Sequence, residues 1–339
     1  MSGQFLTIFE FIIAFILHFS SLVRIGLIFK HKITKKKDMA FFLICLLLNW
    51  SIVCILLIPY ECYGIIVWKP FDEIYHNSLT LFFISLPAHM ALAAIPVSVF
   101  FLTLDRILVI TYGFAQRTNK LIIYLYVLII FIGFGFCATG FMSALNNIPE
   151  KTKCEIFGCI LGPSVEVYLG WRAICSIFNF SSGILFCILL YKSNKKLTLG
   201  GNLQPFPATA LVINEQRKKQ QSKNNKLTIL AIVNEFFLAF IPHFGPFLWE
   251  KIFGQGSSMG TGPLSEFMSG LEVFIFVSVF SQVLKSNNSI DIKSTTQNLN
   301  KEKSNKQNLR QVRASTIFSI RNSWTGENNV RISIGGEIK

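Results

Sequence analysis

Seven long apolar blocks constrain this chain more than any other feature of its sequence. They span roughly residues 5–29, 39–60, 79–110, 121–142, 173–191, 227–249 and 264–284. About twenty apolar residues, each rising ~1.5 Å along a helix, cross the ~30 Å hydrocarbon layer of a bilayer. Because lipid offers the backbone no hydrogen-bond partner, each block is expected to be a helix. The sequence therefore predicts an all-α membrane protein built as a seven-transmembrane helix bundle.

The composition agrees with a bundle that faces lipid. Apolar residues make up 52% of the 339 residues and charged residues only 15%, against about 25% charged residues in a soluble domain. The first block lacks a positive start and is too long for a cleaved signal peptide, so we expect it to stay as an anchor. We expect the transmembrane domain to cover residues 1–285. The tail 286–339, rich in Asn, Ser, Lys and Gln, is expected to be disordered and cytoplasmic.

Lysine and arginine set the expected orientation. Residues 30–38, 106–120, 192–226 and 285–339 lie on one side of the predicted membrane and hold 26 of the 32 Lys and Arg residues. The opposite side holds five, among them Arg172. Basic loops stay in the cytoplasm, so the N-terminus is expected outside and the C-terminus inside. The net charge of +14 is then explained by this topology and by the attraction of the basic loops to anionic lipid. Nucleic acid is not expected as a partner.

Three of the eight cysteines, Cys62, Cys154 and Cys159, fall on the predicted outer side, where disulfides persist. A bond between Cys154 and Cys159 and a bond from Cys62 to either of them are both open. The sequence shows no cysteine and histidine spacing typical of a zinc site. It also shows no phosphate-binding loop and no nucleophile–base pair. We therefore expect no metal, no cofactor and no enzyme activity.

One acid and one arginine interrupt the third block side by side, at Asp105 and Arg106. Asp105 lies about 26 residues beyond Leu79, or ~39 Å along a helix, which exceeds a ~30 Å hydrocarbon core. The pair is therefore expected at the cytoplasmic mouth of the third helix. Taken alone, the pattern also fits an interfacial arginine beside a tolerated aspartate. In a semi-dry site the two side chains can form an ion pair, and release of the arginine is then a two-state event.

Seven spans, an outer N-terminus and Asp105–Arg106 at the inner end of the third helix resemble the rhodopsin-like G-protein-coupled receptors. The resemblance implies that Arg106 holds the inactive bundle and meets a heterotrimeric G protein when the sixth helix moves. Residues 5–285 are similar to a nematode serpentine chemoreceptor. The similarity rests on the phenylalanine-rich spans, on "KKKD" before the second span and on "LDR" in the third. This similarity implies a multi-pass plasma-membrane receptor of sensory neurons that binds a small, lipophilic or volatile ligand.

The chain departs from the receptor pattern at several positions. Ile107 takes the place of the tyrosine that follows the arginine, and the usual disulfide-forming cysteine is absent near Leu81. The seventh span lacks the Asn-Pro-x-x-Tyr pattern, and Asn49 stands where a sodium-binding aspartate is common. The resemblance therefore does not supply the standard disulfide or sodium modulation.

Depth along the predicted spans selects candidate residues for a ligand pocket. The candidates are Phe82, Phe83, His89, Met90, His243 and Glu272. Such a lining is apolar with a few polar groups, as suits small lipophilic molecules. A lone histidine such as His89 or His243 is more often a packed or interfacial residue, and a protonated carboxyl bonded to a neighbouring helix fits Glu272 as well as a ligand contact does. Pro242 is expected to kink the sixth helix below the pocket, although a kink made only for packing fits the sequence too.

A ligand-gated channel or transporter with seven spans is the alternative function. Transporters often carry two similar halves, and the sequence shows no such repeat. Insect-type odorant channels have seven spans in the opposite orientation, so the position of the N-terminus separates the two functions.

An N-terminal epitope tag is expected to bind antibody on intact cells, and a C-terminal tag only after permeabilisation. The reason is that the lysine-rich connections resist translocation. Antibody labelling of intact and permeabilised cells measures both positions. A cytosolic N-terminus would contradict the receptor orientation and favour the channel.

Overall fold

The computed structural model describes residues 2–35, 40–67, 76–112, 120–146, 148, 150–152, 157–161, 164–199, 208–242, 244–245, 252 and 264–283. The chain divides into two compact units, Met1–Ser281 and Gln282–Lys339. The helices and the candidate sites belong to the first unit. The second unit contains the predicted tail and lies outside the described residues apart from Gln282 and Val283.

The described residues form helices and two strands of two residues each, with a few residues in turns and connections. The elements in chain order are α1 Ser2–Lys35, α2 Phe41–Val67, β1 His76–Asn77, α3 Ser78–Leu92, α4 Ile95–Tyr112, α5 Lys120–Leu145, β2 Lys151–Thr152, α6 Phe157–Leu161, α7 Val165–Leu199, α8 Ala208–Asn234, the π-helix η2 Glu235–Phe240 and the last helix Leu264–Val283.

Six stretches of helix in the described part of the chain are long and apolar enough to cross a membrane. They are Leu6–Lys30, Phe41–Val67, Ser78–Tyr112, Lys120–Leu145, Glu166–Lys195 and Leu264–Val283. They support the prediction of an all-helical, multi-pass membrane protein. The predicted span 227–249 falls on the end of α8, on η2 and on residues that lie partly outside the described ones.

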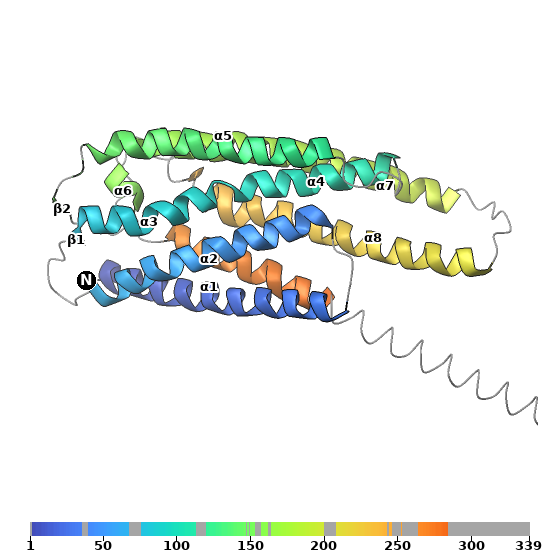
Figure 1. The fold of residues 1–339 in the computed structure, drawn as a ribbon, viewed down its shortest axis with the longest axis horizontal. Coiled ribbons are helices and arrows are strands. Elements are labelled where there is room, and N and C mark those ends of the chain that lie inside the picture. The colour runs from blue at the N-terminus through green and yellow to red at the C-terminus, as the bar shows by residue number, and fades with distance from the viewer. Residues whose placement is uncertain are drawn as a thin grey trace, which may run out of the picture. The chain divides into compact units, whose positions relative to one another are not determined.

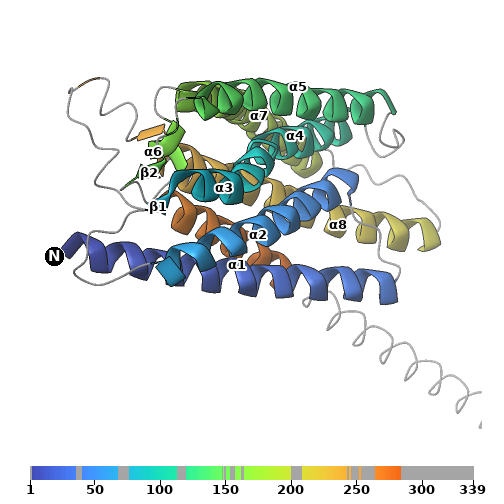
Figure 2. The same cartoon turned by 60° about the vertical axis from the view of Figure 1, so that its left-hand side comes forward.

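The helices of the first unit lie alongside one another (Figures 1 and 2). Helix α1 packs against α2, α2 against α3 and α4, and α4 against α7 and α8. The strands β1 and β2 pair antiparallel, with His76 opposite Thr152 and Asn77 opposite Lys151. Figure 1 shows β1, β2 and α6 together at one end of the bundle, which we call the β1–β2 end.

The third apolar block forms two helices, α3 and α4, separated by a turn at Ala93–Ala94. Pro96 explains the break, because it has no N–H to donate to the Leu92 carbonyl and its ring clashes there. The Ala93 N–H donates to the His89 carbonyl at 3.2 Å, and the chain then enters α4. Pro96 lies in the first turn of α4, where its missing N–H is not needed.

The predicted kink at Pro242 coincides with an irregular stretch of helix. Pro242 cannot donate to the carbonyl of Leu238, one turn earlier. The Ile241 N–H donates to the carbonyl of Phe236, five residues back, and closes the π-helix η2. A π-helix inserts one residue into an α-helix and is frequent at functional sites. The structure thus places a π-turn directly before the proline.

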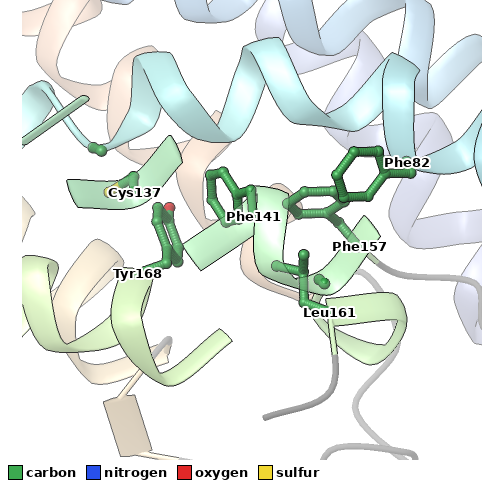
Figure 3. Packing of buried hydrophobic residues seen from close by; sticks show 8 residues of the cluster. Phe82, Cys137, Phe141, Phe157, Leu161 and Tyr168 are labelled. Carbon is green, nitrogen blue, oxygen red and sulfur yellow. The ribbon is translucent and has the colours of Figure 1, made fainter. Parts of the chain in front are cut away.

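Aromatic residues fill the core at the β1–β2 end (Figure 3). Phe157 of the short helix α6 is 1% exposed and lies 5.6 Å from the Phe82 ring and 5.3 Å from the Phe141 ring. Trp171 of α7 packs against this cluster and donates its indole N–H to the Ala93 carbonyl at 3.1 Å. The short helix α6 therefore contributes a buried side chain to the interior of the bundle.

Polar side chains join helices that neighbour each other. The Asn49 amide donates to Ser98 Oγ at 2.6 Å and to the Tyr126 hydroxyl at 3.2 Å, which ties α2 to α4 and α5. His18 Nδ1 donates to Glu61 Oε1 at 2.5 Å, and both side chains are fully buried between α1 and α2. Because lipid supplies no alternative partner, such bonds fix how the helices face one another.

We expect Gly133→Ala to destabilise the bundle by ~1–3 kcal/mol, the usual cost of overpacking. A Cβ at Gly133 would come within 2.6 Å of Trp171 Cε2, and the hydrogen bond to Ala93 restrains that indole. Thermal unfolding in detergent, followed with a dye that reacts with newly exposed thiols such as the buried Cys137, measures the change.

Gly135→Ala on the same helix is the matched control, since nothing lies within 4 Å of its added Cβ. Its melting temperature is expected to stay the same or rise slightly. Equal melting temperatures for the two variants would contradict the close contact between α5 and α7.

Candidate functional site

A ring of ionisable side chains lies inside the bundle. It comprises His89 from α3, Tyr168 and Arg172 from α7, Glu235 from η2, and Glu266 and Glu272 from the last helix, which we call the polar ring. Each of the six residues is at most 8% exposed. Ionisable groups inside a membrane bundle are expensive to bury and commonly mark functional sites.

Helix α7 supplies the one arginine of the polar ring. Tyr168 and Arg172 are four residues apart and therefore lie on the same face of α7. Arg172 Nη1 donates to the Tyr168 hydroxyl at 3.2 Å, and its guanidinium lies 5.8 Å from the centre of the Tyr168 ring. Arg172 also interacts electrostatically with Glu235 and Glu272. The tyrosine thus positions the guanidinium toward two carboxyl groups on other elements.

The Glu235 and Glu272 carboxyl groups face each other across η2 and the last helix. The neighbouring Asn234 amide donates to the Glu272 backbone carbonyl at 3.5 Å, which joins the same two elements. Two ionised carboxylates repel each other in a space without water, so Arg172 supplies the compensating charge. Apart from the Glu272 carboxyl group that faces it, Glu235 has no hydrogen-bond donor among the described residues.

His89 and Glu266 form the other side of the polar ring. His89 Nδ1 faces the Ser85 carbonyl at 3.0 Å, so this nitrogen carries the proton. His89 Nε2 lies 3.7 Å from Glu266 Oε1, and the Ser265 hydroxyl donates to Glu266 Oε2 at 2.7 Å. The imidazole centre is 4.4 Å from the centre of the Phe157 ring. The polar ring is therefore bordered by aromatic rings on the side of α6.

The structure brings several predicted pocket residues together and separates others. Phe82, His89 and Glu272 are buried, and Met90 packs against the same core cluster. Phe83 is 55% exposed and packs edge-on against Phe82, so its ring lies outside the interior that holds the others. The predicted pocket residue His243 lies outside the described residues.

Four members of the polar ring are not among the pocket residues that the sequence selects: Tyr168, Arg172, Glu235 and Glu266. The sequence places Arg172 in an outer connection because the fifth apolar block starts at Ala173. The helix α7 starts at Val165, which places Arg172 inside it. The spacing of four residues between Tyr168 and Arg172 is the available signal, since it predicts a shared helix face.

A second candidate site lies near the end of α4. Arg106 Nε donates to Asp105 Oδ2 at 3.0 Å, and Nη2 donates to the same oxygen. The Arg106 side chain is 8% exposed and that of Asp105 is 13% exposed. Among the described residues, Asp105 is the ion-pair partner of Arg106. His89 and Arg106 are 17 residues apart on the α3–α4 pair, a helical distance of ~25 Å.

The remaining predicted site residues are cysteines. Cys62 is a free thiol in the structure. Cys154 and the side chain of Cys159 lie outside the described residues, so a bond between these two stays a prediction. No cluster of three or more His, Cys, Asp and Glu side chains suited to a metal ion occurs in the ranges that the structure describes.

A multi-pass helical bundle with a buried polar interior and an Asp–Arg pair near a helix end has the organisation of a serpentine receptor. Residues 1–288 match the family model of the serpentine type 7TM GPCR chemoreceptor Srbc. The chain therefore belongs to the Srbc family of nematode chemoreceptors. The resemblance found in the sequence is confirmed, and the family match supplies the subfamily. A search of the curated proteins gives no match.

We expect Arg172→Met to destabilise the bundle by ~3–5 kcal/mol, the usual cost of removing one partner from a buried charge cluster. The change leaves Glu235 and Glu272 without their cation, although methionine fills a similar apolar volume. The melting temperature in detergent measures this loss.

The double variant Arg172→Met/Glu235→Gln is expected to recover part of the lost stability, because glutamine removes one uncompensated carboxyl group. If the single and double variants melt at the same temperature, Arg172 does not compensate Glu235.

Proposed function

We propose that the chain is a chemosensory receptor with a ligand site and a separate G-protein coupling site. A small, lipophilic or volatile molecule binds beside the polar ring. Arg106, near the other end of the α3–α4 pair, then couples this event to a heterotrimeric G protein. Membership of the Srbc family supports a receptor, and the two buried clusters supply candidate residues for each step.

The interior near the β1–β2 end supports a ligand site. Phe82, Phe157 and Tyr168 supply apolar ring surface around His89. Pockets for small molecules combine such an apolar lining with a few polar groups that fix orientation. Here the polar ring provides the orienting groups.

The buried Asp105–Arg106 pair is the observation that carries the signalling half of the proposal. An arginine near a helix end could reach water by extending its side chain. Arg106 instead stays largely buried and paired with its neighbour. A partner that needs the guanidinium must therefore displace it from Asp105. Ligand would bias this two-state event through its different affinity for the two bundle arrangements.

The proposed setting is the plasma membrane of a sensory neuron, with the N-terminus outside and the C-terminus inside. The uneven distribution of lysine and arginine between the two sides supports this orientation. The β1–β2 end would then face the exterior, where chemical stimuli arrive, and Arg106 would face the G protein.

We expect Asp105→Asn to raise ligand-free nucleotide exchange on a co-expressed G protein several-fold. Asparagine removes the negative charge that holds Arg106, so the guanidinium is free more often. Arg106→Ala is expected to abolish exchange, and the double variant should match Arg106→Ala. Guanine-nucleotide binding to membranes with equal receptor levels at the cell surface measures all three.

Arg24→Ala is the matched control. Arg24 donates to Ser278 Oγ at 2.8 Å and lies over the Phe274 ring, so its contacts are with the last helix. Its exchange rate is expected to stay near that of the unmodified receptor. If the double variant kept the raised exchange of Asp105→Asn, Arg106 would not be the coupling residue.

A further inference from the structure

Several buried polar atoms around the polar ring lack a hydrogen-bond partner within the described part of the chain. They are the hydroxyls of Ser85 and Ser269, together with both carboxyl oxygens of Glu235, which have no donor among the described residues other than the Glu272 carboxyl group. All three residues are at most 2% exposed. A buried polar group without a partner costs ~1–3 kcal/mol. Three such groups in one region leave hydrogen-bonding capacity that another molecule can satisfy.

The unpartnered atoms lie next to ring members on three different elements. Ser85 is one turn before His89 on α3, and its carbonyl accepts the His89 Nδ1–H. Ser269 lies midway between Glu266 and Glu272, three residues from each, on the buried face of the last helix. Glu235 faces Glu272 from η2. The unpartnered atoms therefore lie beside the polar ring on three elements, α3, η2 and the last helix.

The missing partner must donate hydrogen bonds, and a cation suits a site rich in acidic side chains. The polar ring holds three carboxyl groups, of Glu235, Glu266 and Glu272, against the one guanidinium of Arg172. Arg172 already donates to Tyr168, and the His89 proton is used by a carbonyl. Acceptors in the polar ring therefore outnumber donors, and acidic side chains outnumber the one guanidinium.

We propose that the polar ring binds a small alkylamine in its ammonium form, with the nitrogen donating to Glu235 and Ser269. This assignment rests on the proposed function, because it names the ligand class of that same site. An ammonium group has three donors, which matches the unpartnered acceptors better than the single donor of an alcohol. A carboxylate ligand would add further acceptors to a site that already has more acceptors than donors.

The rings beside His89 suit the rest of such a ligand. Phe157 and Tyr168 lie 4.4 Å and 6.0 Å from the His89 ring, measured between ring centres. Their faces attract a cation, and their surface packs against an alkyl chain. The ligand is therefore expected to be both basic and lipophilic, with the nitrogen toward η2 and the last helix.

The test is thermal stabilisation of the purified full-length chain in detergent at neutral pH. The probes are n-alkylamines of four to eight carbons, each with the alcohol and the carboxylic acid of equal chain length. We expect amines to raise the melting temperature and the matched alcohols and acids to leave it unchanged. Glu235→Gln is expected to raise the half-maximal amine concentration at least tenfold.

Glu10→Gln is the matched control, because Glu10 is also buried but lies on α1, which supplies no member of the polar ring. Its half-maximal amine concentration should stay within about twofold of that of the unmodified chain. Should Glu235→Gln fail to fold, Ser269→Ala replaces it, with an expected increase of about threefold, as suits the loss of one neutral hydrogen bond.

Three results would each overturn the amine assignment. These are stabilisation by alcohols or acids equal to that by amines, an unchanged amine concentration in the folded Glu235 or Ser269 variant, and no stabilisation by any probe. Nucleotide exchange on a G protein keeps the two proposals distinguishable. Exchange driven only by alcohols or acids preserves the receptor function and rejects the amine. Amine stabilisation without nucleotide exchange supports the amine site and rejects the receptor function.

Discussion

The absence of water inside the bilayer is the constraint on which the rest of this structure depends. A buried arginine in a soluble protein can often reach solvent by a small movement, whereas Arg172 is surrounded by helices that themselves face lipid. Its charge must therefore be met by Tyr168, Glu235 and Glu272 within the bundle. The same requirement pairs His18 with Glu61 and Asn49 with Ser98. Polar contacts thus specify which helix faces which, while apolar surface alone would allow many arrangements.

The α3–α4 pair connects the two buried clusters. His89 lies before the break at Ala93–Ala94, and Arg106 lies well beyond it. The break at Pro96 and the π-helix before Pro242 are two places where the regular ladder of backbone bonds is interrupted. Such places absorb changes in backbone angles more easily than continuous helix does. In the proposed receptor they would let the β1–β2 end adjust to a ligand while the Arg106 end responds.

The sequence predicts the helices well because the length of an apolar block reports directly on the thickness of the membrane. It predicts the Asp105–Arg106 pair for the same reason, since the position of a charge within a block gives its depth in the bilayer. It does not predict helix rotation, and this is why Phe82 and Phe83 look equivalent although only Phe82 is buried. It also misplaces Arg172, because Glu166 and Arg172 itself interrupt the apolar residues of this stretch and hide the true start of α7. Which carboxyl groups meet that guanidinium depends on three elements far apart in the chain.

The most direct test of the buried charge cluster is an experimental structure of the full chain in a lipid nanodisc. We predict that the Arg172 guanidinium lies inside the bundle, bonded to the Tyr168 hydroxyl and facing the carboxyl groups of Glu235 and Glu272. An Arg172 side chain extended to the membrane surface, with the two glutamates apart, would contradict this prediction.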